Sequence, residues 1–207
     1  MNIQSMVAPK ARRGRPAERP DRRESILDAA LRCFVDRGFY GTSMPEIAEA
    51  AEVSAGTIYH YFDSKEALVN AVYRAWKSTV AQRVFAAFPA TAPVREQFRV
   101  MWHEMVAFAR GAPAAFAFIE THNHASYLDD ESRAVDRNLH MFVHAVIVRA
   151  QREGLVKPLD GWVLMELVFG AFINLMRAHW EKRIELTDEI VRDAELACWD
   201  TIAIHPT

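Results

Sequence analysis

The stretch SAGTIYHYFDSKEAL, Ser54 to Leu68, contains one short helix and the start of a longer one. Ser54 is a favoured N-cap residue, and Asp63-Ser64-Lys65-Glu66 has capping-box spacing. Between these two starts lie five bulky residues in a row, Ile58 to Phe62. Consecutive side chains point all the way round a helix, so some of these five must face something other than the chain's own core.

A helical wheel divides this short helix into two faces. At about 3.6 residues per turn, Phe62 and Tyr61 lie on the side of Ile58, with Tyr61 near its edge. The opposite face carries small or polar side chains: Gly56, Thr57, Tyr59 and His60. A glycine permits close backbone approach, and the other three side chains can bond phosphates or base edges.

The flanking segments predict three more helices. Before the stretch, Ile26, Ala30 and Phe34 recur every four residues, and Gly38 is a natural stop. A second helix starts at Ser43-Met44-Pro45-Glu46 and runs for barely two turns, while the helix after Asp63 continues to Pro89. Two short helices braced by longer ones are typical of a helix-turn-helix, whose second helix enters the DNA major groove.

The remaining chain also reads as helix. It has 207 residues, 51% hydrophobic, with only 8 Gly and 9 Pro, and shows no alternating strand pattern. We expect an all-α fold of about nine helices. It divides into an unstructured basic arm (1–20), a three-helix helix-turn-helix domain (21–66) and a larger helical domain for ligand binding and dimerisation (67–207).

Several functional classes are disfavoured by what the sequence lacks. The two cysteines are far apart, which favours a reducing, cytoplasmic setting. No apolar run approaches the ~18 residues of a membrane helix, so we expect no membrane association. Without a nucleophile elbow, phosphate-binding glycine loop or HExxH motif, we expect no enzyme and no cofactor. An all-α enzyme or carrier, and a sequence-neutral architectural protein, are the alternatives.

The first 23 residues hold seven basic and two acidic side chains, whereas the whole chain has a net charge of −2. An anionic partner near the N-terminus explains this asymmetry, and a solvated tail is the simpler alternative. Within the arm, Arg13-Gly14-Arg15-Pro16 is similar to the core of an AT-hook, which lays Arg13 and Arg15 into a narrow minor groove. Arg22 opens the first helix, where a cation opposes the helix dipole unless a phosphate lies nearby.

The stretch GFYGTSMPEIAEAAEVSAGTIYHYFDSKEAL, Gly38 to Leu68, resembles the DNA-binding domain of the TetR family of bacterial transcriptional regulators. The resemblance implies an all-α dimer, most often a repressor that a small ligand releases from DNA. It implies phosphate contacts from Ser43, Tyr59, Tyr61 and Lys65. It also implies base contacts from around Met44, Ala55, Gly56, Thr57 and His60. Ala55 departs from the longer polar residue of many relatives, which leaves it at most an apolar contact to a thymine methyl.

The larger domain is rich in aromatic, Met and His side chains, which suits a site for a small apolar or aromatic ligand. The alternative is that most of them only fill the core. The predicted ligand-binding residues are Trp102, Met105, Phe108, Phe116, Ile119, His122, Tyr127, Phe142, Trp162, Met165 and Phe169. His140 and His144 share a helical face, but no carboxylate or Cys completes a ligand set, so we expect no metal.

The segment Gly161 to Trp180 is apolar on several faces, which indicates burial on several sides. With the last helix it can form a two-fold four-helix interface, the alternative being an ordinary monomer core. The predicted interface residues are Leu164, Leu167, Val168, Ala171, Phe172, Leu175, Ile190, Ala194 and Cys198. The sequence as a whole predicts a homodimeric repressor that binds a palindromic operator in double-stranded DNA and is released by a small-molecule effector.

Overall fold

The computed structural model describes residues 22–121, 124 and 126–205. Arg13, Arg15 and His122 of the predicted sites lie outside these residues. The helices are α1 (Arg22–Arg37), α2 (Met44–Ala50), α3 (Ala55–Tyr61), α4 (Lys65–Ala87), α5 (Val94–Gly111), α6 (Pro113–Thr121), α7 (Asp130–Arg152), α8 (Gly161–Trp180) and α9 (Asp188–Ile202). In this described part there is no strand, only an isolated bridge between Val156 and Ala203. The all-α expectation is confirmed.

The helix starts follow the capping signals of the sequence. Each of five helices begins at a side chain that accepts a hydrogen bond from a backbone N–H of the first turn, which satisfies a donor that the helix itself cannot pair. These N-cap residues are Ser54, Ser64, Asp129, Asp160 and Thr187. At the other end of α1, Gly38 adopts a φ of 70°, a conformation that glycine takes without steric cost.

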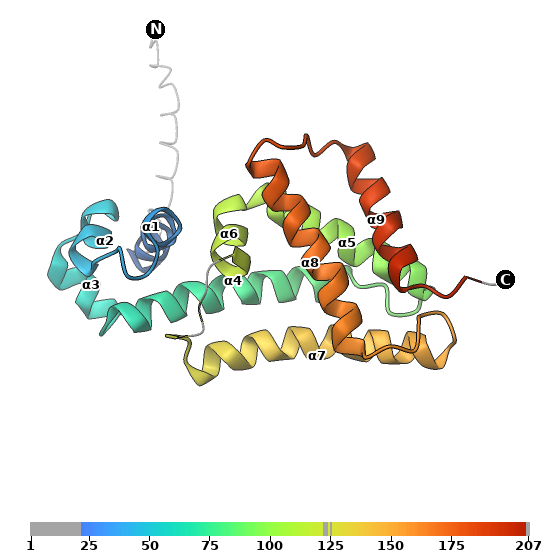
Figure 1. Ribbon diagram of the computed structural model, residues 1–207. Coiled ribbons are helices and arrows are strands. Elements are labelled where there is room, and N and C mark those ends of the chain that lie inside the picture. Colours follow the sequence, from blue (N-terminus) through green and yellow to red (C-terminus); the bar gives the residue numbers. More distant parts are fainter. Residues whose placement is uncertain (1–21, 122–123, 125, 206–207) are drawn as a thin grey trace, which may run out of the picture.

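The small domain of α1, α2 and α3 closes around apolar side chains that are fully buried, among them Ile26, Phe34 and Ile47. The long helix α4 starts in this domain and runs on beneath α5 and α6 and beside α7 in the larger domain (Figure 1). It therefore crosses the expected domain boundary at residue 66 without a break. A rotation of α4 would move both domains together.

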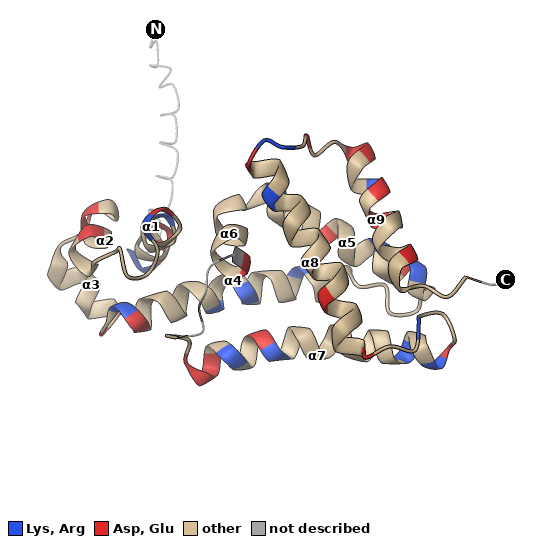
Figure 2. Ribbon diagram, viewed as in Figure 1, with Lys and Arg blue, Asp and Glu red and all other residues tan. Residues whose placement is uncertain are grey.

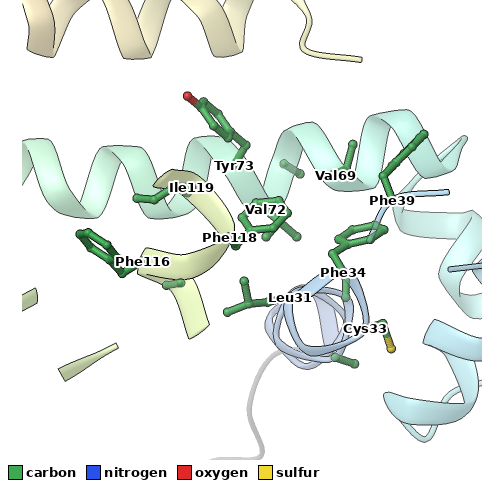
Figure 3. Packing of buried hydrophobic residues seen from close by; sticks show 14 of the residues in the cluster. Leu31, Cys33, Phe34, Phe39, Val69, Val72, Tyr73, Phe116, Phe118 and Ile119 are labelled. Carbon is green, nitrogen blue, oxygen red and sulfur yellow. The ribbon is translucent and has the colours of Figure 1, made fainter. Parts of the chain in front are cut away.

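The two domains share one apolar core. Figure 3 shows Phe34 and Leu31 of α1 pointing toward α6, with Val72 of α4 beside them. The ring of Phe34 stacks on that of Phe118 of α6, with centroids 6.1 Å apart. Because α1, α4 and α6 bury the same side chains, the small domain is held by two elements of the larger one.

Asn70 joins α4 to the segment between α6 and α7. Its buried amide donates to the carbonyl oxygens of Glu66 and Tyr127 at 2.8 Å each, and its Oδ1 accepts from the Asp129 backbone N–H at 2.9 Å. Arg74 adds an ion pair to Asp129 at 2.7 Å. These contacts set the position of the α7 start relative to α4.

We expect Asn70→Ala to lower the free energy of unfolding by about 1–3 kcal/mol, because it leaves the part-buried Tyr127 carbonyl and Asp129 N–H without their partner. Urea denaturation followed by circular dichroism measures this loss. Thr79→Ala is the matched control on the same helix, since the Thr79 hydroxyl is exposed and bonds only its own helix. Equal midpoints for the two variants would contradict the role given to Asn70.

Candidate DNA-binding face and ligand cavity

Helix α3 presents one side to the core and one to solvent. Ile58 is fully buried and Phe62 nearly so, whereas Tyr59 is 50% exposed. Gly56 and His60 are exposed as well, as is Ala55 in the first turn. This division agrees with the helical wheel and leaves the predicted recognition face available to a partner.

Two residues at the edge of this face are held by contacts within the chain. Thr57 is half-buried, and its hydroxyl lies 2.8 Å from that of the cap Ser54. The exposed fraction of the Tyr61 side chain is that expected for a residue at the edge of the face. Its ring meets the His60 ring edge-on, with centroids 5.3 Å apart. The aromatic pair orients two of the predicted DNA-contacting side chains toward the same surface.

The start of α2 differs from expectation at Met44. This side chain is 6% exposed and belongs to the core of the small domain, so it does not face a base. Ser43 is exposed, but its Oγ donates to the Glu46 carboxylate at 2.7 Å and its N–H to the same oxygen at 2.8 Å. These hydrogen bonds, followed by the Arg37 guanidinium, hold the pKa of Glu46 below its ordinary value.

Lys65 has a structural partner that sequence reasoning missed. Its ammonium donates to the carbonyl oxygens of Phe39 and Thr42 at 2.8 Å each, and lies 4.3 Å from the centroid of the Phe39 ring. The cation at the start of α4 is therefore explained without a phosphate. The carbonyl groups it binds come from the turn between α1 and α2, so Lys65 also positions α2.

Charge does not gather on the recognition helix. Residues 22–66 hold five Lys and Arg against eight Asp and Glu, and α3 carries no charged residue, as its tan ribbon shows (Figure 2). Arg22 is exposed at the start of α1, and Arg23 lies over the Phe62 ring at 5.5 Å. Attraction of phosphates thus depends on groups outside α3.

The larger domain encloses a cavity of about 150 Å³ bordered by α4, α5, α6, α7, α8 and α9. Its wall is mostly apolar, as ligand sites usually are. Six of the predicted ligand-binding residues line it: Trp102, Met105, Phe108, Phe116, Met165 and Phe169. The structure brings these six together from α5, α6 and α8.

Four other predicted residues do not line the cavity. Ile119 is buried in the core shared with α1, and Tyr127 stacks on Phe39 at 4.3 Å. Phe142 packs against Phe85 and Phe88, and Trp162 is exposed and stacks on His144. For Ile119 and Phe142 the reason is helix rotation, because each lies one position before a lining residue, Glu120 or Val143, and points to a different neighbour.

One end of the cavity carries a buried charge network that the sequence analysis missed. Lys77 of α4 is 4% exposed and contacts Glu120 of α6 at 2.9 Å and Asp136 of α7 at 3.0 Å. Asp136 also accepts from Tyr73 at 3.2 Å and lies 3.4 Å from His140. The available signal was the position of Lys77, four residues after Tyr73 and three before Val80 on the apolar side of α4.

The protonation of this network follows from burial and neighbouring charges. Burial opposes the charged form of Lys77, but Glu120 and then Tyr73 and Asp136 raise the pKa of its ammonium above the ordinary value. Burial raises the pKa of Glu120 despite the nearby Lys77. The network therefore keeps the lysine charged and makes Glu120 a weaker acid than usual.

The expected dimer interface is partly buried within the chain. Leu164 and Phe172 are 1% and 0% exposed and pack in the chain's own core, which contradicts their assignment to an interface. Leu167 and Ala171 are exposed, and Val168, Leu175, Ile190, Ala194 and Cys198 are half-buried. Sequence reasoning missed Val163 and Leu196, both 50% exposed.

Helix α8 is apolar over most of its surface. By length and composition alone it could cross a membrane, but it packs against α7 and α9 within the helical domain. The side that this packing leaves open includes Val163 and Leu167. Exposed apolar side chains on α8 and α9 are typical of a surface that another protein covers.

Comparison with known proteins agrees with this architecture. Residues 26–72 match the bacterial regulatory proteins of the tetR family, and residues 66–204 match the tetracyclin repressor-like C-terminal domain. An uncharacterised HTH-type transcriptional regulator of Haemophilus influenzae is 28% identical over 191 residues, covering 88% of this chain and 96% of the relative. A TetR family transcription regulator of Marinobacter aquaeolei superposes with a TM-score of 0.81 at 27% identity, covering 89% and 96% of the chains.

A third similarity is confined to the DNA-binding end. The HTH-type transcriptional repressor KstR2 of Rhodococcus jostii is 43% identical over 53 residues, 26% of each chain. The family matches cover both domains found in the structure, a helix-turn-helix domain and a helical domain that contains a cavity. The chain belongs to the TetR family. It is a DNA-binding transcriptional regulator and not an enzyme.

We expect Lys65→Met to lower the free energy of unfolding by about 1–3 kcal/mol, because two carbonyl groups lose a charged donor. In the folded variant, the salt dependence of DNA binding should stay unchanged. A fall of about one in that slope would instead show that Lys65 contacts a phosphate. Lys182→Met, at an exposed turn position, is the control for loss of a lysine charge.

Proposed function

We propose that this protein is a dimeric repressor that leaves a palindromic operator when a small apolar molecule enters the cavity. The observation that carries the proposal is that α4 and α6 both line the cavity and both pack on α1. Lys77 and Glu120 border the cavity, while Phe118 of α6 contacts Phe34 of α1. An occupant that shifts either helix also shifts the DNA-binding domain.

The mechanism is a change in the populations of two conformers. The occupant binds one arrangement of α4 and α6 more tightly than the other, and so favours it. In that arrangement the two α3 helices of the dimer no longer match successive major grooves. A shift from mostly bound to mostly released requires the occupant to prefer one state by about 10⁴-fold.

Dimerisation follows from the outward sides of α8 and α9. A face with Val163, Leu167 and Leu196 half exposed is stabilised when a second copy covers it. A two-fold pair of such faces forms a four-helix interface and presents two α3 helices. Half-sites on DNA then lie one helical turn apart, about 34–36 Å, or a multiple of it.

The DNA contacts of the basic arm are supported by the charge of the chain, and the repressor role by a similar protein. The acidic charge of residues 22–66 makes the basic arm the main source of attraction for DNA, so Arg13 and Arg15 are proposed to contact the minor groove. Repression is supported by the similarity to the transcriptional repressor KstR2, which is confined to the DNA-binding end. A regulator of this kind acts in the cytoplasm, where bacterial DNA lies.

Selection of binding sites from random DNA tests the central proposal. We expect a palindrome that the wild-type dimer binds at least about 10³-fold more tightly than scrambled DNA at physiological salt. His60→Ala should reduce this ratio more than it reduces binding to scrambled DNA, because a base contact carries the specificity. His205→Ala, an exposed histidine near the C-terminus, is the matched control. Absence of any preferred sequence would disprove specific operator recognition.

Leu167→Glu tests the dimer interface. A charge in the centre of the apolar face should produce monomers at concentrations where the wild type is a dimer, without loss of helix content, because Leu167 is exposed in the single chain. Light scattering after size exclusion measures the mass. Met141→Glu, an equally exposed apolar position on α7, should remain dimeric. A dimeric Leu167→Glu variant would place the interface elsewhere.

A further inference from the structure

The lining of the cavity extends along several turns of α5 and α7. On α5 its lining residues extend from Val94 to Phe108, which corresponds to about 21 Å of helix, and on α7 from Leu139 to Ala150, about 16 Å. A volume of about 150 Å³ that extends along several helical turns suits an elongated occupant.

The two ends of the cavity differ in chemistry. The far end is closed by buried aliphatic side chains that form their own cluster: Val94, Ala150, Val156, Leu164 and Ile202. The near end holds Lys77, Glu120 and His140, and the lining also includes Arg83 and Glu104, which are paired with each other. An occupant that leaves this pair intact is apolar over most of its length and polar at one end.

The polar end has an excess of hydrogen-bond acceptors. One ammonium, that of Lys77, is bound by two carboxylates, those of Glu120 and Asp136. The Glu120 Oε1 accepts a hydrogen bond from the Lys77 ammonium. Among the residues that the structure describes, no hydrogen bond reaches the Glu120 Oε2. The Glu120 side chain is 11% exposed and borders the cavity, so its carboxylate can accept a hydrogen bond from a donor on the occupant.

The charges at the polar end of the cavity also favour an occupant whose head donates a hydrogen bond. Two carboxylates face the single ammonium of Lys77, and a further anion in the same space is repelled by them. The pKa of Glu120 is raised by burial, which reflects how poorly its charge is solvated there. A donor head relieves this cost, whereas a carboxylate head adds to it.

We propose that the effector is an unbranched aliphatic molecule whose single polar end donates a hydrogen bond, a hydroxyl or an ammonium, to Glu120. The chain lies between α5 and α7 with its tail against the aliphatic cluster at the far end. That this occupant regulates DNA binding rests on the proposed function. The head contacts α4 and α6 at the same point, since Lys77 and Glu120 are already paired.

Binding of matched probes to the full-length protein tests the chemistry. Calorimetry compares n-dodecanol, n-dodecylamine and n-dodecanoate, which share a chain and differ in the head. The alcohol or the amine should bind at least about tenfold more tightly than the carboxylate, a difference of about 1.4 kcal/mol. The affinity should rise with chain length from hexyl upward, and 2-naphthalenemethanol should bind more weakly than the dodecyl probe.

Variants locate the head and the chain. Glu120→Gln, which replaces an ionised acceptor by an amide, should abolish the preference for the donor head. Ile147→Trp should obstruct the cavity beside the aliphatic cluster and weaken the dodecyl probes, including those that do not depend on Glu120. Phe142→Ala is the control on the same helix, because its ring lies outside the cavity against Phe85 and Phe88.

The outcomes separate this inference from the proposed function. Tighter binding of dodecanoate, lost in Arg83→Ala but not in Glu120→Gln, would overturn the inference and place an anionic head at the Arg83–Glu104 pair. No binding by any probe to a protein that still recognises its operator would also overturn it, and would leave DNA recognition intact. Tight binding of the alcohol without any effect on operator affinity would confirm the ligand chemistry and refute ligand-controlled release.

Discussion

Helix α4 is packed into the DNA-binding domain over its first turns and against the ligand cavity over the next ones. Leu68, Val69 and Val72 are buried against α1 and α6, and one turn later Lys77 and Val80 border the cavity. A helix is stiff over this distance because each turn is hydrogen-bonded to the next. In the proposed mechanism, displacement at the cavity is therefore carried to α1 and α3 without a separate hinge.

The contact between α6 and α1 restricts movement of the small domain relative to the larger one. If α4 were the only link, the small domain could swing about it, but Phe118 against Phe34 closes a second path between the same two parts. The charge network then connects α4 to α6 and α7 at the cavity end. Removing one partner from such a buried pair usually costs about 3–5 kcal/mol, so an occupant can rearrange these groups only if it satisfies them.

Much of the fold could be predicted because its signals are local. Ser54, Ser64 and Asp129 cap helices through bonds to residues three positions away, and the exposure of Tyr59 and His60 follows from their angle to Ile58. The cavity was predicted only in part. Six of the predicted residues line it, all of them aromatic or Met, but Phe142 and Trp162 are also aromatic and point elsewhere.

The amino-acid sequence determined the number of helices, their approximate ends and the face of α3 that stays exposed, because capping and periodicity act within a few residues. Only the packing of distant segments decided the rest. It placed Lys65 on the carbonyl groups of Phe39 and Thr42, paired Lys77 with Glu120 across 43 positions, and buried Leu164 and Phe172 in the chain's own core. Periodicity shows that a side is apolar or charged, but not which neighbour covers it; that depends on helix rotation and on contacts remote in sequence.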